Sequence, residues 1–170
     1  AERLNELADL ARAIDNALER AMTNTPATPD DLKNLFGESY SEERQDEAQE
    51  TWGHTDAWRQ SASRTKRYTA SDWAAMKAES EQVNAAFAAA LSAGMPADSP
   101  DALAAAEAHR RHIEAWFYDL DHSFHRGLAD MYLADPRFTK TYEDLAPGLA
   151  AYVHDAIHAN ADARQGTEGD

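Results

Sequence analysis

The feature that most restricts the fold of this chain is the spacing of its apolar residues, which is helical over nearly the whole length. Alanine, leucine, glutamate and arginine are abundant, and each of them favours helix. No segment alternates β-branched and polar residues, as a half-buried strand would. We therefore predict an all-α protein of roughly five or six helices, with a helical arm at its N-terminus.

Residues 2–20 carry a seam of apolar residues at alternating steps of three and four: Leu4, Leu7, Ala11, Ile14 and Leu18. This spacing is typical of a coiled-coil helix that pairs with a second helix. An amphipathic helix packed on its own domain would show the same spacing. We favour pairing between two chains, because residues 22–27 are rich in Thr and Pro and do not form a tight turn. Residues 1–21 are thus expected to dimerise, and 22–27 to be a loose linker.

Residues 28–52 begin with clear helix signals but contain few apolar residues. Thr28 and Pro29 form an N-cap and a first helical position, and Gly37 is a stop signal. The stretch EERQDEAQETWG that follows is strongly acidic. Because this segment can bury little apolar surface, we expect it to be only marginally ordered on its own.

Longer helices are predicted further along the chain. We expect one helix from about Thr55 to Lys66 and a second from about Ser71 to just before Gly94. A third begins at Ser99 and Pro100, and a fourth runs through HSFHRGLADMYLAD and ends before Asp135-Pro136. The last begins near Pro147. The last residues, 161–170, have the composition of a disordered tail.

The composition excludes several classes of function. The net charge of −15 disfavours binding to nucleic acid or to an anionic membrane. Disulfides, thiolate metal ligands and cysteine nucleophiles are excluded because the chain contains no cysteine, which suits a reducing cytoplasm. No apolar run approaches the length of a membrane span, and the first residues do not have the pattern of a signal peptide.

Three histidine pairs have spacings that place two imidazoles on one face of a helix. They are His109 with His112, His122 with His125, and His154 with His158. None of them belongs to a Glu-x-x-His repeat or to a zincin motif, so we attribute the spacings to chance and predict no metal site. The chain also lacks a phosphate-binding loop and a nucleophile elbow, so we predict no catalytic residues, no enzymatic activity and no cofactor.

The densest group of aromatic and polar side chains is the tract 116–125. A core position is the simpler explanation for any single aromatic residue, but four of them within nine residues cannot all face one way on a helix. The tract also spans a predicted helix break at 119–121. We predict that it lines a cleft for a small molecule, since rigid apolar faces with a few polar groups suit such a pocket. The predicted ligand-binding residues here are Trp116, Phe117, Tyr118, Leu120, His122, Phe124 and His125.

Several motifs resemble the TipAS-type antibiotic-recognition domain. They are LFG, WG-x-TDA, YT-x-x-DW, GMPADSPDAL, MYLADPRFTKTY and APGLAAYVHDAIHANA, which follow the family's order over about residues 28–160. The resemblance implies a compact, globin-like helical domain that binds thiopeptide and other macrocyclic antibiotics. It also implies the effector half of a MerR-family transcription activator, with residues 1–21 as the end of its dimerisation helix. The winged helix-turn-helix that contacts DNA would lie upstream of Ala1.

The resemblance further implies that residues 28–52 form a mobile lid over the ligand, and we expect Phe36, Tyr40 and Trp52 to be its contact residues. Family members that capture dehydroalanine-bearing thiopeptides covalently have a cysteine where this chain has Leu120. We therefore expect non-covalent binding. An alternative with the same pocket is a stand-alone resistance protein that sequesters the drug and regulates nothing. The apolar seam of residues 2–20 favours the regulator, because a sequestering protein needs no dimerising arm.

Overall fold

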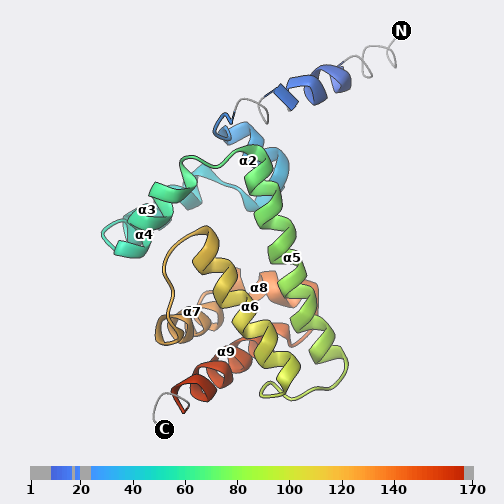
Figure 1. Ribbon diagram of the computed structural model, residues 1–170, viewed down its shortest axis with the longest axis vertical. Helices are drawn as coiled ribbons and strands as arrows, with labels where there is room; N and C mark the ends of the chain where they lie inside the picture. The colour runs from blue at the N-terminus through green and yellow to red at the C-terminus, as the bar shows by residue number, and fades with distance from the viewer. Residues whose placement is uncertain (1–8, 17, 20–23, 167–170) are drawn as a thin grey trace. The chain divides into compact units, whose positions relative to one another are not determined.

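The computed structural model describes residues 9–16, 18–19 and 24–166. From residue 29 onward it contains α2 (Pro29–Phe36), the 3₁₀ helix η1 (Gly37–Ser39), α3 (Glu42–Trp52), α4 (Asp56–Thr65), α5 (Ala70–Ser92), α6 (Pro100–Trp116), α7 (His122–Ala134), α8 (Pro136–Leu145) and α9 (Leu149–Gln165) (Figure 1). The predicted all-α fold is confirmed, and none of the residues in these described ranges lies in a β-strand. The described part of the chain also contains no helix with the length and apolar character needed to cross a membrane.

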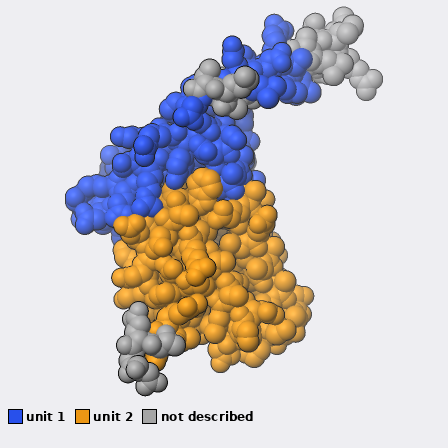
Figure 2. All heavy atoms as spheres, viewed as in Figure 1, with its two compact units in different colours: residues 1–77 blue, residues 78–170 orange. Residues whose placement is uncertain are grey.

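The chain divides into two compact units, residues 1–77 and residues 78–170, which Figure 2 colours separately. The division falls inside α5, which continues through it as one helix. The domain predicted for residues 28–160 therefore extends over parts of both units. No change in composition marks this division in the sequence, because the residues on both sides of it belong to the same helix.

The short helices of the first unit are defined by their caps. Thr28 caps α2 in a reciprocal capping box with Asp31. Ser41 caps α3, and Thr55 caps α4. Gly37 ends α2 with a φ of +58°, a left-handed conformation that glycine adopts without strain. None of α2, α3 and α4 contains a buried residue, so local hydrogen bonds rather than a core define these helices.

The described part of the predicted N-terminal arm is helical over residues 9–16 and 18–19. Leu10, Ile14 and Leu18 are each more than half exposed there. Leu4 and Leu7 of the predicted seam lie outside the described residues, as do residues 22–23 of the predicted linker. The helix is thus confirmed over the described residues, and its pairing with a second chain stays a prediction.

The second unit is built around α9, which contacts α6, α7 and α8 (Figure 1). Leu149, Val153 and Ile157 of α9 have no exposed surface. They share a core with Phe87 of α5, which is also fully buried. Many of the other core residues are alanines, which allow helices to approach closely. They include Ala90, Ala102, Ala105, Ala106, Ala129, Ala150 and Ala156.

Over the described residues 29–166 the structure has eight α-helices, more than the five or six predicted, and three of them differ from the prediction. No helix was predicted for the acidic stretch that forms α3 or for α8, although Asp135 caps α8 and Pro136 takes its first position, as Ser99 and Pro100 do in α6. The third difference is the length of α9, which continues to Gln165. The predicted disorder is therefore wrong for residues 161–165, because Ala161 is buried there and Asp162 pairs with Arg126 of α7. Residues 167–170 lie outside the described residues.

Candidate ligand-binding site

The predicted ligand-binding tract lies where α6 ends and α7 begins. Helix α6 ends at Trp116, residues 117–121 form the connection, and α7 begins at His122. The Asp121 carboxylate caps α7 by accepting a hydrogen bond from the Phe124 backbone N–H at 2.7 Å. The predicted helix break at 119–121 is confirmed.

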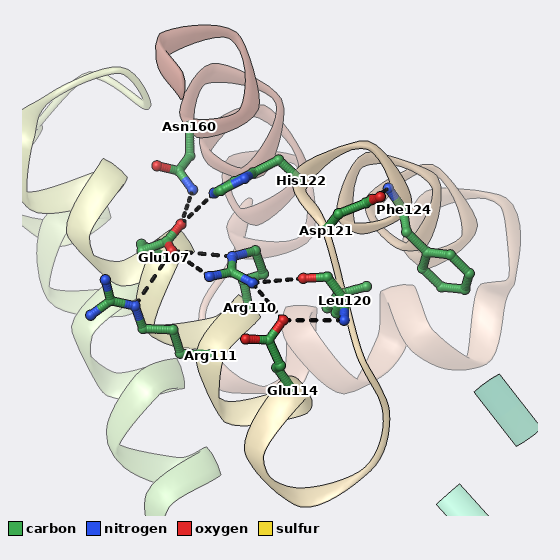
Figure 3. Close-up of polar contacts among 9 residues, drawn as sticks. All are labelled: Glu107, Arg110, Arg111, Glu114, Leu120, Asp121, His122, Phe124 and Asn160. Atoms are coloured by element: carbon green, nitrogen blue, oxygen red, sulfur yellow. Dashed lines mark hydrogen bonds and ion pairs between the residues drawn. The ribbon is translucent and has the colours of Figure 1, made fainter. Parts of the chain in front are cut away.

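The peptide groups of Leu120 are held on both sides by side chains of α6 (Figure 3). Arg110 Nη1 donates to the Leu120 carbonyl oxygen at 2.6 Å, and Glu114 Oε2 accepts from the Leu120 N–H at 3.3 Å. Arg110 and Glu114 also pair with each other at 2.9 Å. The Leu120 side chain is only 1% exposed, so it faces the interior. The connection is therefore fixed to α6 by charge-assisted hydrogen bonds.

The buried Glu107 carboxylate joins α6, α7 and α9 (Figure 3). Its Oε1 accepts from Arg110 Nε at 3.1 Å and from Arg110 Nη2 at 2.8 Å. Its Oε2 accepts from Asn160 Nδ2 at 2.8 Å and lies 2.8 Å from His122 Nε2. Burial raises the pKa of Glu107, but the hydrogen bonds from Arg110, Asn160 and His122 together outweigh burial and lower it to about 2. The network therefore centres on a carboxylate that is ionised at neutral pH.

Two further histidines form a buried pair. His109 Nδ1 of α6 lies 2.8 Å from His125 Nε2 of α7, and the two rings stack with centroids 5.1 Å apart. Burial lowers the pKa of His109 to about 4. The pKa of His125 is lowered to about 3, mainly by burial and to a smaller extent by the charge of a protonated His109. Both rings are thus neutral at pH 7, with one ring nitrogen donating to the other. His125 is 1% exposed and lies in the interior, not at a surface.

The aromatic residues of the tract differ from this polar network because they are partly exposed. Phe124 is 47% exposed, and its ring centroid lies 5.8 Å from that of Tyr118. In Figure 3 the Phe124 ring points away from the buried network. Burial raises the pKa of Tyr118 to about 12, so its hydroxyl keeps its proton and can donate a hydrogen bond. Trp116 and Phe117 are both half-buried, and the Trp116 indole Nε1 donates to Glu79 Oε2 at 3.3 Å.

Phe36, Tyr40 and Trp52 belong to the first unit. Phe36 and Tyr40 line a pocket of about 540 Å³, and Phe36 also makes an edge contact with Trp73, at a centroid distance of 6.1 Å. Trp52 is the last residue of α3, is 48% exposed and is not part of this lining. The structure thus brings Phe36 and Tyr40 to one pocket, which Trp52 does not line.

The sequence patterns did not identify the polar residues that hold the tract in place. Glu107, Arg110 and Glu114 are spaced at steps of three and four, so their ion pairs along one face of α6 were foreseeable. Asn160 gives no such signal, because it lies 53 residues from its partner Glu107.

Chemically, the arrangement suits binding better than proton transfer. Glu107 accepts hydrogen bonds at both oxygens, and His109 and His125 are buried and neutral. None of these three groups therefore offers a base to a molecule at the surface. Partly exposed aromatic rings on a fixed backbone instead provide a rigid apolar contact surface.

The fold and the site together define an all-α domain that presents aromatic side chains at the break between two helices. Residues 45–160 match the sequence profile of the TipAS antibiotic-recognition domain. This chain belongs to the TipAS antibiotic-recognition domain family, as its motifs predict.

Proteins similar to this chain are transcription regulators. The HTH-type transcriptional activators TipA of Streptomyces coelicolor and Streptomyces lividans are each 40% identical to it over 159 residues. The match covers 94% of this chain but 63% of each activator, so the chain spans less than two thirds of their length. The HTH-type transcriptional activator mta of Bacillus subtilis is 31% identical over 128 residues, which cover 75% of this chain and 42% of mta.

A solved structure of TipAS from Streptomyces lividans shares the fold. It matches with a TM-score of 0.75 at 42% sequence identity, and the match covers 81% of this chain and 96% of the TipAS chain. That structure was solved in complex with nosiheptide, as part of a thiopeptide antibiotic multidrug resistance system.

Proposed function

We propose that this chain is the ligand-sensing domain of a drug-responsive transcription activator and that it binds an apolar macrocyclic or polycyclic antibiotic without a covalent bond. Thiopeptide-like compounds are the first class to test. The observation that carries the proposal is membership of the TipAS family, since a relative 42% identical in sequence was solved with nosiheptide bound.

We assign the contact surface to the four aromatic residues Trp116, Phe117, Tyr118 and Phe124. Large rigid rings offer much apolar area and lose little conformational entropy on binding. The backbone between them is held by Arg110 and Glu114 before any ligand arrives. A ligand therefore does not have to order this segment, which favours affinity.

Leu120 and His125 support this surface from the interior, because each is only 1% exposed. His122 keeps 28% of its side chain exposed and lies between Glu107 and solvent, so it is the polar contact residue of the tract. A thioether bond to a dehydroalanine is impossible because the chain has no cysteine. Incubation with a dehydroalanine-containing thiopeptide should therefore leave the intact mass unchanged, and a covalent adduct would contradict this part of the proposal.

Residues 28–52 take the role of a lid. Helices α2 and α3 contain no buried residue, so packing stabilises them little in the free chain. Contact between a ligand and Phe36, Tyr40 and Trp52 would add the apolar burial that these helices lack. Amide exchange of residues 28–52 should then be fast without ligand and slow with it. Equal protection in both states would show that the segment is not a lid.

Binding can be measured by titration calorimetry with nosiheptide as the probe. We expect Phe124→Ala to weaken binding about tenfold or more, the usual effect of removing a central aromatic contact. Phe138→Ala is the matched control, because Phe138 is also a partly exposed phenylalanine, at 39%, but lies on α8. An equal loss in both variants, or no binding by the unmodified chain, would count against the assigned surface.

As part of a transcription regulator, the chain would have two partners besides the ligand, a second copy of itself and DNA. A homodimer would form through residues 1–21, and a winged helix-turn-helix encoded upstream of Ala1 would contact DNA in the cytoplasm. The exposed Leu10, Ile14 and Leu18 support the dimer, and the activators similar to this chain are named as HTH-type. The genomic sequence upstream of Ala1 tests the assignment. If it encodes no helix-turn-helix, the drug-sequestering alternative replaces the regulator.

A further inference from the structure

Three potential metal ligands converge on the surface of the second unit, outside the aromatic tract. Asp130 of α7 places its Oδ1 atom 2.9 Å from His154 Nε2 and 2.8 Å from His158 Nε2, both on α9. The three ligand atoms lie within 4.8 Å of one another. Because His154 and His158 are four residues apart on a helix, they share one face, with ring centroids 4.3 Å apart.

We infer that Asp130, His154 and His158 form a binding site for a divalent transition-metal ion such as Zn²⁺. Two imidazole nitrogens and one carboxylate oxygen are a common ligand set for zinc and its neighbours in the first transition row. Mg²⁺ and Ca²⁺ instead prefer oxygen ligands alone. Three protein ligands leave at least one coordination position of a tetrahedral ion for water, so the bound metal ion would exchange with metal in solution.

The second nitrogen of His154 supports this inference. Its Nδ1 atom lies 2.9 Å from Asp155 Oδ1, an arrangement that metal-binding histidines typically make with a carboxylate. When Nδ1 carries the proton of a neutral ring, Nε2 directs a lone pair at the Asp130 oxygen. A metal ion between these two atoms turns their repulsion into two coordinate bonds.

The site is accessible from solvent. The exposed side-chain fractions are 61% for Asp130, 22% for His154 and 26% for His158. The net charge of −15 adds a field that attracts cations. A metal ion here would tie α7 to α9, which already pack against each other. Occupancy would therefore raise the stability of the second unit, whether or not the proposed antibiotic binds.

The sequence alone did not indicate this site. The spacing of His154 and His158 was attributed to chance because neither belongs to a Glu-x-x-His motif. The third ligand comes from α7, 24 residues before His154, and only the packing of the two helices brings it close. This inference therefore reverses the prediction of no metal site for one of the three histidine pairs.

The test uses the whole chain after its metal has been removed with a chelator. Zn²⁺ at a hundredfold excess over Kd should raise Tm by about 5 to 11 °C. His158→Ala and Asp130→Asn should each abolish this rise, while Asp155→Asn should weaken binding about tenfold, because it keeps all three ligand atoms. His54→Ala is the control: His54 is exposed and lies in the first unit, so its loss should leave the rise intact.

Visible absorption of bound Co²⁺ gives a second measurement that does not depend on stability. One equivalent of Co²⁺ should produce a ligand-field band with the unmodified chain, and neither His158→Ala nor Asp130→Asn should show it. Asp130 is exposed, so Asp130→Asn is expected to fold even if His158→Ala does not. The inference is overturned if Zn²⁺ stabilises both variants as much as the unmodified chain, if Mg²⁺ reproduces the rise, or if Co²⁺ yields no band.

Discussion

The helices of the two units are stabilised in different ways. In the first unit, α2, α3 and α4 begin at the capping residues Thr28, Ser41 and Thr55, and none of them contains a buried residue. In the second unit, α6 and α9 each contribute several buried residues to one core. Local hydrogen bonds are thus sufficient to start a helix. Only the helices of the second unit are also stabilised by extensive burial of apolar side chains.

This difference also separates the polar interactions of the two units. Ion pairs of the first unit, such as Lys33 with Glu42 and Arg59 with Asp56, are solvent-exposed and contribute little to stability. Glu107 and Arg110 of the second unit are nearly buried, so removing one of them would take from the other its closest opposite charge in a site with little water. Parts of a protein that change on binding usually come from its less stable regions, which fits a lid in residues 28–52.

The largest expected effect comes from the core of the second unit. Phe87→Ala should lower the free energy of unfolding by about 3 to 5 kcal/mol, because Phe87 has no exposed surface and its removal leaves a cavity. Phe36→Ala in the first unit should cost less than about 1.5 kcal/mol, because Phe36 is only half-buried. Urea denaturation followed by circular dichroism measures both. Equal costs would remove the proposed difference between the units.

Acidification should lower the stability of the second unit. The pKa values of buried His109 and His125 are lowered from 6.5 to about 4 and about 3, so their contribution to stability is complete above pH 6.5 and is lost as pH falls toward 4. With two protons taken up on unfolding, the loss is at most about 2.7 kcal/mol per pH unit. Glu107 adds nothing in this range, because its lowered pKa makes its contribution fall only below pH 4.5. His154, whose pKa is raised, opposes the trend slightly.

Urea midpoints at pH 7, 6 and 5 measure this slope. A double variant with leucine at positions 109 and 125 should flatten it, whereas His54→Ala, a change at an exposed histidine, should not. A slope that survives in the double variant would mean that other groups cause the acid sensitivity.

A smaller effect is expected from the charge of Glu107. Glu107→Gln keeps the shape of the side chain but removes the charge that Arg110, Asn160 and His122 stabilise, and it should cost about 2 kcal/mol. Glu50→Gln in α3 is the matched control, because that exposed residue should change stability by less than about 0.5 kcal/mol. The same urea measurements compare them. A cost near zero for Glu107→Gln would show that the network contributes geometry without net stability.

Helix signals that lie close together in sequence were predictable. Thr28–Pro29 and Ser99–Pro100 marked the starts of α2 and α6, and Gly37 marked the end of α2. Asp135–Pro136 carries the same signal for α8 but was interpreted only as the end of the preceding helix. The division inside α5 was not predictable, because it depends on which helices pack together and not on local composition.

The helix break within the aromatic tract was predictable, whereas the burial and the partners of its residues were not. The aromatic tract and its helix break follow from residues 116–125, but the burial of Leu120 and His125 depends on their partners in α6. The Glu107–Asn160 contact and the Asp130–His158 contact join residues far apart in sequence, so only the tertiary fold brings them together.

The smallest expected effect tests the capped helices of the first unit. Thr28→Ala removes the hydroxyl that accepts from the Asp31 N–H, leaves the Thr28 N–H that donates to the Asp31 carboxylate, and should destabilise α2 by about 1 kcal/mol. Because α2 contains no buried residue, the change should appear as faster amide exchange in residues 29–36, with the unfolding midpoint of the second unit unchanged. Thr28→Ser, which keeps the hydroxyl, should exchange at the rate of the unmodified chain. A matching fall in the second unit's midpoint would show that the two units unfold as one, and that capping in the first unit contributes to the stability of the core.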